Sequence, residues 1–194
     1  MRKIILLTGI LFYANLNAQS SKKDEGIVFG LKGGLNISNF IGDIQNNDIR
    51  TSAHFGLISE IMINDKFSLQ PELLYSAQGY SGRPAPGFSR SKYDYINFPV
   101  LAKIYVAKRI SVEAGPQIGF LLSAKERTSN DIIPISNQNK VDFGLNLGLA
   151  FDLKNGVFFQ TRYNLGLSNI NEGLDKNEKR IANSVIHSSI GIKF

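Results

Sequence analysis

The sequence predicts an all-β fold, an eight-stranded antiparallel up-and-down transmembrane β-barrel. Apolar and polar residues alternate with a period of two through most of the chain, which is typical of strands with two different faces. The connections between these strands alternate long and short, as in barrels that have long outer loops and short periplasmic turns. After the N-terminal region no apolar run approaches the length of about 18 residues that a spanning helix needs, so a membrane-inserted chain would cross with strands.

The N-terminal residues have the pattern of a secretory signal peptide. Arg2 and Lys3 precede an apolar run, and small and polar residues follow this run up to Ala18. The run is too short for a spanning helix, and we expect cleavage after about Ala18. The chain then divides into a signal peptide (residues 1–18), a short N-terminal periplasmic segment (19–26) and the outer-membrane β-barrel domain (27–194).

The composition excludes several classes of protein. The formal net charge of +6 falls to about +4 when Arg2 and Lys3 leave with the signal peptide, and the remaining basic residues are scattered among loops and turns. A nucleic-acid-binding protein would concentrate them on one face. The chain has no cysteine, which excludes a disulfide framework, a thiolate metal site and a cysteine nucleophile.

The first part of the barrel is predicted from three strands, residues 27–37, 53–63 and 67–78. Apolar side chains occupy odd positions in each of them, while small, polar and charged residues occupy most even positions. A long polar stretch separates the first two strands, and the short turn at residues 64–66 joins the second and third. A loop rich in Gly and Pro follows.

The middle of the chain has the clearest hairpin pattern. Apolar side chains occupy even positions in residues 93–106 and again in residues 110–122, on either side of a break at residues 107–109. Each strand has roughly 11 residues, which is about the length that a tilted strand needs to cross a bilayer. This unit is therefore predicted to be a two-faced β-hairpin.

The last three strands follow a polar segment, residues 123–140, which is predicted to be a loop because it is rich in Asn and Ser. Residues 141–153 alternate without interruption, and an Asn-Gly hairpin turn leads into residues 157–168. A charged loop precedes the final strand, residues 183–194. Eight strands with four long loops and three short turns place both termini on the periplasmic side.

The two faces of these strands differ in chemistry, and this difference assigns the apolar face to lipid. The polar face is mostly Gly, Ser, Asn and Gln with a few charges of mixed sign, which suits the crowded interior of a narrow barrel if the charges pair. The predicted polar network of the lumen consists of Lys32, Glu60, Glu72, Lys103, Glu113, Asp142, Arg162 and Lys193.

Aromatic residues on the apolar face are predicted to form two girdles at the membrane interfaces, because they fall near the two ends of the strands. The girdle at the periplasmic ends comprises Phe29, Phe67, Phe151, Phe159 and Phe194, and the girdle at the outer ends comprises Phe55, Tyr75, Phe98, Phe120 and Phe143.

Some residues fit the alternating pattern less well. Pro71, Pro99 and Pro116 lie inside strands, where each removes a ladder hydrogen bond, so each is expected at a bulge or an unpaired site. Five apolar residues point inward by parity and would have to pack within the lumen: Ile58, Leu74, Leu101, Leu121 and Phe158.

Five segments carry a family resemblance: GLKGGLNISNF, EIMINDKFSLQPELLYSAQGY, YINFPVLAKIYVAKRISVEAGPQIGFLLSA, DFGLNLGLAFDLKNGVFFQTRYNLGLSNI and the terminal IGIKF. They resemble the outer-membrane β-barrel (porin-like, PorT-like) family of Bacteroidetes over nearly all of the mature chain. The resemblance implies an outer-membrane location and a small barrel, and it carries no established activity. Phe194, preceded by Ile190 and Ile192, is similar to the signal by which the barrel assembly machinery recognises its substrates.

An enzyme is not predicted. His54 and His187 point inward by parity, but no nucleophile motif surrounds His54. Ser188 and Ser189 follow His187, and adjacent strand residues face opposite sides of a sheet. We therefore predict no catalytic residue and no cofactor.

A metal site and a general diffusion pore are not predicted either. The acidic residues within 46–48 and 130–131 lack the ordered ligand spacing of a calcium loop. Eight strands leave an interior that side chains just fill, so passive solute flux should be negligible.

The sequence therefore favours a non-enzymatic outer-membrane barrel that presents four surface loops, with a structural, adhesive or secretion-accessory role. Expected partners are outer-membrane lipid, the barrel assembly machinery and, by resemblance to PorT-like proteins, a secretion-system protein; nucleic acid is not expected. Two alternatives stay open: a soluble exported lipocalin-like barrel that binds a small apolar ligand, and a small outer-membrane hydrolase that depends on His54. The loop cations expected to contact lipopolysaccharide phosphates are Arg83, Arg90, Lys92, Lys125, Arg127, Lys176, Lys179 and Arg180.

Overall fold

The computed structural model describes residues 26–42, 47–82, 89–127, 131–135, 138–170 and 181–194. The predicted signal peptide, its cleavage point after Ala18 and residues 19–25 lie outside this part of the chain. No helix among the described residues is long and apolar enough to cross a membrane.

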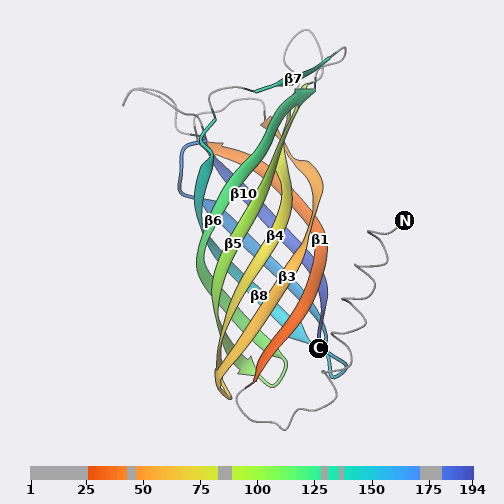
Figure 1. Ribbon diagram of the computed structural model, residues 1–194, viewed down its shortest axis with the longest axis vertical. Coiled ribbons are helices and arrows are strands. Elements are labelled where there is room, and N and C mark those ends of the chain that lie inside the picture. The colour runs from red at the N-terminus through yellow and green to blue at the C-terminus, as the bar shows by residue number, and fades with distance from the viewer. Residues whose placement is uncertain (1–25, 43–46, 83–88, 128–130, 136–137, 171–180) are drawn as a thin grey trace, which may run out of the picture.

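Eight long strands close into an antiparallel barrel, which confirms the predicted fold (Figure 1). Successive strands pair around the barrel, and β1 pairs with β10 from Gly30 opposite Lys193 to Gly42 opposite Ile181, which closes the sheet. The barrel strands are β1 (Ile27–Gly42), β3 (Arg50–Asn64), β4 (Phe67–Gly82), β5 (Ser89–Ala107), β6 (Ile110–Arg127), β8 (Val141–Asp152), β9 (Val157–Gly166) and β10 (Ile181–Lys193).

The prediction ends several strands too early on the long-loop side. β1, β4 and β6 continue to Gly42, Gly82 and Arg127, and two short strands, β2 (Asn47–Asp48) and β7 (Ile132–Pro134), pair with β4 and β6. The predicted loop over residues 123–140 is therefore wrong for the end of β6 and for β7. The strands continue because their inward faces bury an apolar cluster in the outer mouth of the barrel, formed by Phe40, Tyr93, Tyr95 and Ile170.

The barrel exposes apolar side chains and buries polar ones. Leu147 is 61% exposed on the outer face, whereas Arg162 is 1% exposed on the inner face. A soluble lipocalin-like barrel has the opposite arrangement, so that alternative does not fit. Four of the inward-pointing apolar residues, Ile58, Leu74, Leu101 and Phe158, are buried in the lumen, and Leu121 packs against the cluster in the outer mouth.

Each strand proline lies where a ladder is interrupted. Two consecutive pairs are missing from each of three ladders, and one of the two contains a proline. The β3–β4 ladder lacks the pair of Ser59 with Pro71 and the pair next to it. The β4–β5 ladder likewise lacks the pair of Glu72 with Pro99 and its neighbour, and the β5–β6 ladder lacks the pair of Val100 with Pro116 and its neighbour. The register does not shift at these places, so the prolines mark unpaired sites and not bulges.

Two neighbouring glycines of β1 test the packing of the barrel wall. A Cβ at Gly34 would lie 2.0 Å from the Ser188 carbonyl oxygen of β10, whereas a Cβ at Gly33 would lie 3.5 Å from the His54 carbonyl oxygen. Gly34→Ala should therefore lower the free energy of unfolding by about 1–3 kcal/mol or more through overpacking, and Gly33→Ala should leave it nearly unchanged. Urea unfolding of both variants in the same lipid, followed by heat-modifiable gel migration, would measure this difference; equal stability would contradict it.

Candidate functional site

A buried ion network fills the middle of the lumen, and Glu72 is its centre. The Glu72 carboxylate on β4 accepts hydrogen bonds from Lys32 Nζ of β1 at 2.8 Å and from Arg162 Nη2 of β9 at 3.0 Å. Its second oxygen accepts a hydrogen bond from Gln70 Nε2 at 2.7 Å. Strand alternation turns all four side chains inward, so one carboxylate neutralises part of the charge of two cations that have no access to water.

Neutral amides carry this network further around the barrel. Lys32 Nζ donates to Gln160 Oε1 at 2.6 Å, and Gln160 Nε2 donates to Glu113 Oε2 at 2.9 Å. Nearer the outer end, Asp142 accepts a hydrogen bond from Asn183 Nδ2 at 2.8 Å. Within the described residues neither Glu113 nor Asp142 makes a direct ion pair, so these two predicted network residues are held by amides.

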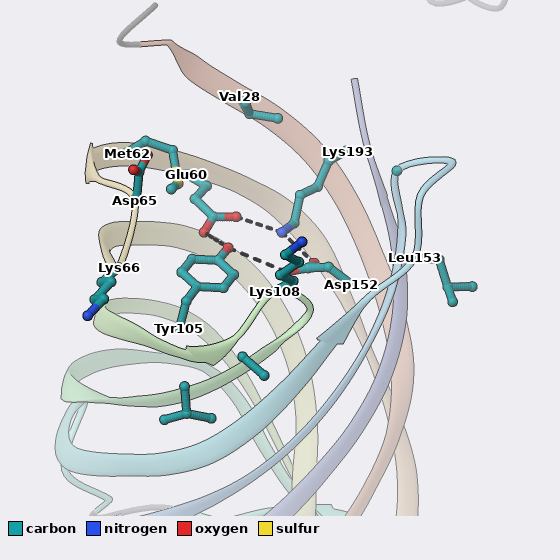
Figure 2. A pocket seen from close by; sticks show the side chains of 13 residues that line it. Val28, Glu60, Met62, Asp65, Lys66, Tyr105, Lys108, Asp152, Leu153 and Lys193 are labelled. Carbon is teal, nitrogen blue, oxygen red and sulfur yellow. Dashed lines mark hydrogen bonds and ion pairs between the residues drawn. The ribbon is translucent and has the colours of Figure 1, made fainter. Parts of the chain in front are cut away.

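A second ionic cluster closes the periplasmic end of the lumen (Figure 2). Lys193 Nζ lies 2.6 Å from Glu60 Oε2 and 2.6 Å from Asp152 Oδ1. The Tyr105 hydroxyl donates its one hydrogen to Glu60 and lies 3.3 Å from Asp152 Oδ2. Lys103 Nζ lies 3.2 Å from Glu60 Oε1 on the lumen side. The cluster joins β3, β5, β8 and β10. This cluster and the central network together place six of the eight predicted lumen charges in ion pairs.

This cluster forms the floor of a cavity of about 600 Å³ that opens at the periplasmic turns. The turn residues Asp65, Lys66 and Lys108 lie at its rim (Figure 2). Its walls are largely apolar and comprise Val28, Met62, Val106, Ala107 and Leu153.

The structure brings the two histidines of the lumen together, which the sequence reasoning did not anticipate. His54 Nδ1 and His187 Nδ1 lie 2.6 and 2.7 Å from the same oxygen, Asn36 Oδ1. Asn36 Nδ2 donates to the Ala77 carbonyl at 2.6 Å, so the amide oxygen faces the histidines and each Nδ1 is the donor. The signal that could have found this cluster is the shared inward parity of residues on β1, β3 and β10.

Ser189 completes a Ser–His–Asn arrangement with these residues. His54 Nε2 lies 2.7 Å from Ser189 Oγ and, because Nδ1 carries the proton, it accepts the hydroxyl hydrogen. Nucleophile, base and orienting amide thus stand in the order of a hydrolase triad. However, Ser189 is 6% exposed and Asn36 is fully buried inside a filled lumen, so a carbonyl substrate has no approach to the hydroxyl. The arrangement satisfies buried polar groups of the lumen.

The outer halves of β5 and β6 carry a basic ladder, which we define as Arg90, Lys92, Lys125 and Arg127. Arg90 lies opposite Arg127, and Lys92 lies opposite Lys125, in adjacent antiparallel strands. All four side chains are exposed. Ser91 and Tyr93, which alternate with Arg90 and Lys92 along β5, are buried, so the ladder faces away from the barrel axis. Lys92 also pairs with Asp94 at 3.0 Å. The remaining predicted loop cations, Arg83, Lys176, Lys179 and Arg180, lie outside the described residues.

The predicted girdle aromatics lie on the outer face at two levels. At the outer level Phe55 packs on Tyr75 with ring centroids 5.2 Å apart, and Phe98 packs on Phe120 at 5.9 Å. At the periplasmic level Phe151 lies opposite Phe159. The terminal residue joins this level because Phe194 N donates to the Phe29 carbonyl at 2.9 Å, next to the strand positions of Ile190 and Ile192. Phe67 lies at the periplasmic end of β4, and Phe143 lies near the outer end of β8.

No group of three or more His, Cys, Asp or Glu side chains is placed to hold a metal ion in the part of the chain that the structure describes. Of the two acidic segments considered for calcium, residues 46 and 130 lie outside that part.

Comparison with known proteins agrees with the geometry. A family model described as "Outer membrane protein beta-barrel domain" matches residues 17–172. No curated protein matches the chain. Among solved structures, the attachment invasion locus protein Ail of Yersinia pestis superposes with a TM-score of 0.56 at 13% identity, covering 88% of this chain and 99% of Ail. Neisserial surface protein A superposes with a TM-score of 0.57 at 11% identity, covering 88% of this chain and 100% of that protein. At these identities the likeness concerns the fold.

The central ion network predicts a large cost for removing its carboxylate. Glu72→Gln leaves Lys32 and Arg162 buried without their shared counter-charge, so the free energy of unfolding should fall by about 3–5 kcal/mol. Asp65→Asn, which neutralises an exposed carboxylate on a periplasmic turn, should change it little. Denaturant midpoints of both variants in one detergent would test this, and similar midpoints would refute the role given to Glu72.

The burial of Ser189 predicts that it does not react with substrate-like electrophiles. The folded protein should show no labelling by a fluorophosphonate probe above the level of Ser189→Ala, because the hydroxyl lies inside the lumen. Labelling is read by gel fluorescence of the unheated, folded band. Labelling that disappears in both Ser189→Ala and His54→Ala would instead establish a hydrolase site.

Proposed function

The chain belongs to the family of outer membrane protein beta-barrel domains, and from this premise we propose that it is a non-enzymatic surface protein that binds anionic groups of the outer leaflet. Family and fold give an outer-membrane location. The observation that carries the proposal is the outward-facing basic ladder on β5 and β6. The role is structural or adhesive, because the ladder lies on the outer face of the barrel. There it would bind anionic groups around the barrel and not a solute inside the lumen.

The ladder stands on the outer side of the aromatic level, on the extensions of β5 and β6. Lys92 lies six residues beyond Phe98 on β5, and Lys125 lies five residues beyond Phe120 on β6. With a rise of about 3.3 Å per residue and a strand tilt of about 40°, the cations stand roughly 12–15 Å above the outer aromatic level. The interfacial layer is about 5–7 Å thick on each side of the membrane, so the cations project outward past it, where they face anionic groups that lie above the leaflet.

The charge pattern of the ladder favours binding of an anion between the two strands. Like charges directly opposite each other in an antiparallel pair are destabilising, and here two such pairs follow one another on the same face. A phosphate between the two strands accepts charge-assisted hydrogen bonds from both and relieves the repulsion. Asp94 pairs with Lys92 at 3.0 Å.

Two further observations support this function. Ail, which shares the fold, has been solved in complex with the heparin analogue sucrose octasulfate, so a barrel of this shape can display an anion-binding surface. The lumen of this chain is filled by large buried side chains, including Arg162, Lys103 and Phe158, which supports a barrel without general diffusion. Cleavage after about Ala18 and recognition of Phe194 by the assembly machinery are part of the same proposal.

The ladder predicts weaker association with lipopolysaccharide when its lysines are neutralised. Lys92→Gln combined with Lys125→Gln should reduce the affinity for lipopolysaccharide micelles several-fold and lower its dependence on salt, since exposed charges are screened. The matched control is Lys108→Gln combined with Lys154→Gln, which removes two lysines from the periplasmic turns. Binding of detergent-solubilised protein to immobilised lipopolysaccharide measures both; an equal loss in the two double variants, or none in the first, would remove the proposal.

A further inference from the structure

We propose that the cavity at the periplasmic end of the barrel is a binding site for small amphipathic carboxylates, that is, one carboxylate attached to a short apolar body. This site lies at the opposite end of the barrel from the basic ladder and does not depend on it. The cavity of about 600 Å³ falls within the range of small-molecule sites, about 300–1,000 Å³.

The floor of the cavity offers a hydrogen-bond donor to a ligand. Glu60 is saturated, because it accepts hydrogen bonds or ion pairs from Ser68, Tyr105, Lys103 and Lys193. Lys193 has three ammonium hydrogens and uses two of them, toward Glu60 and Asp152. Its side chain is 13% exposed and faces the cavity, so its third hydrogen is available to an incoming oxygen (Figure 2).

The rim of the cavity favours a negative charge. Lys66 and Lys108 stand at the rim, and among the described residues neither forms an ion pair. The carboxylates that face them are Asp65 at the rim and Asp152 at the floor, the latter neutralised by Lys193. At the rim two cations stand against the single carboxylate of Asp65, while Glu60 and Asp152 at the floor are paired with Lys193, so the rim favours an anionic head.

The walls select an apolar body. The apolar lining includes Val28, Met62, Ala107 and Leu153. Burial of an apolar group against these side chains removes apolar surface from water, a favourable contribution that a purely ionic ligand would not gain. The same chemistry is found in the C-terminal residue of a peptide and in a free fatty acid, and the experiment below separates these sources.

Met62 provides a direct reporter for this site. The chain has two methionines, Met1 and Met62, so the protein without its first residue carries a single methionine in the cavity wall. The methyl resonance of [methyl-¹³C]methionine in the detergent-solubilised protein should shift on addition of N-acetyl-Leu-Leu or of decanoate. A shift with the peptide alone identifies peptide C-termini, a shift with decanoate alone identifies fatty acids, and a shift with both identifies the amphipathic carboxylate in general.

The charge requirement is tested with one variant and its matched control. Lys108→Glu should weaken binding of the effective probe at least tenfold, whereas Lys154→Glu, on a neighbouring turn but not lining the cavity, should stay within twofold. The C-terminal amide of the peptide, or decylamine, should produce no shift. Heat-modifiable migration confirms that each variant is folded. The proposal is overturned by an unchanged Met62 resonance with both probes, by equal weakening in the two variants, or by an amide that binds as well as the acid.

Discussion

The pairing of β1 with β10 is the contact on which the rest of the structure depends. Lipid offers no hydrogen-bond partners, so every strand must find both neighbours within the sheet, and only the closing pair from Gly30 to Gly42 removes the last open edges. Closure with eight strands also fixes a narrow interior. The narrow interior then forces its charged side chains to neutralise each other, which the Glu72 and Glu60 clusters accomplish.

Different interactions fill the two ends of the barrel. The periplasmic end is closed by an ionic cluster around Lys193, beneath a cavity formed by short turns. The outer end is closed by aromatic packing around Phe40 and Tyr93, on strands that continue beyond the lipid-facing belt. Exposed cations stand on the outer side of those extensions, so each end of the barrel keeps a surface for contacts.

Alternation of side chains was sufficient to predict the eight strands, their order and the inward face, because a period of two survives whatever the partner strand is. It could not predict the strand extensions, because residues 38–42 and 123–127 contain polar residues that are typical of loops. In the structure the inward side chains of these extensions pack in an aromatic cluster. Nor could it pair particular charges or join His54 to Ser189, because those contacts depend on register between strands distant in sequence. The Bacteroidetes and PorT-like assignment stays a prediction.

The ladder interruptions at Pro71, Pro99 and Pro116 make one sector of the barrel wall less rigid than the rest. The missing pairs lie in three successive interfaces, β3–β4, β4–β5 and β5–β6, while the wall from β8 through β10 to β1 keeps its paired ladders. A cylinder with one compliant sector responds to lateral pressure by becoming elliptical along a fixed axis. Changes in bilayer tension would therefore be absorbed on the β4–β5 side, which carries Glu72, while the strands of its two cations, β1 and β9, would keep their spacing to their common neighbour β10.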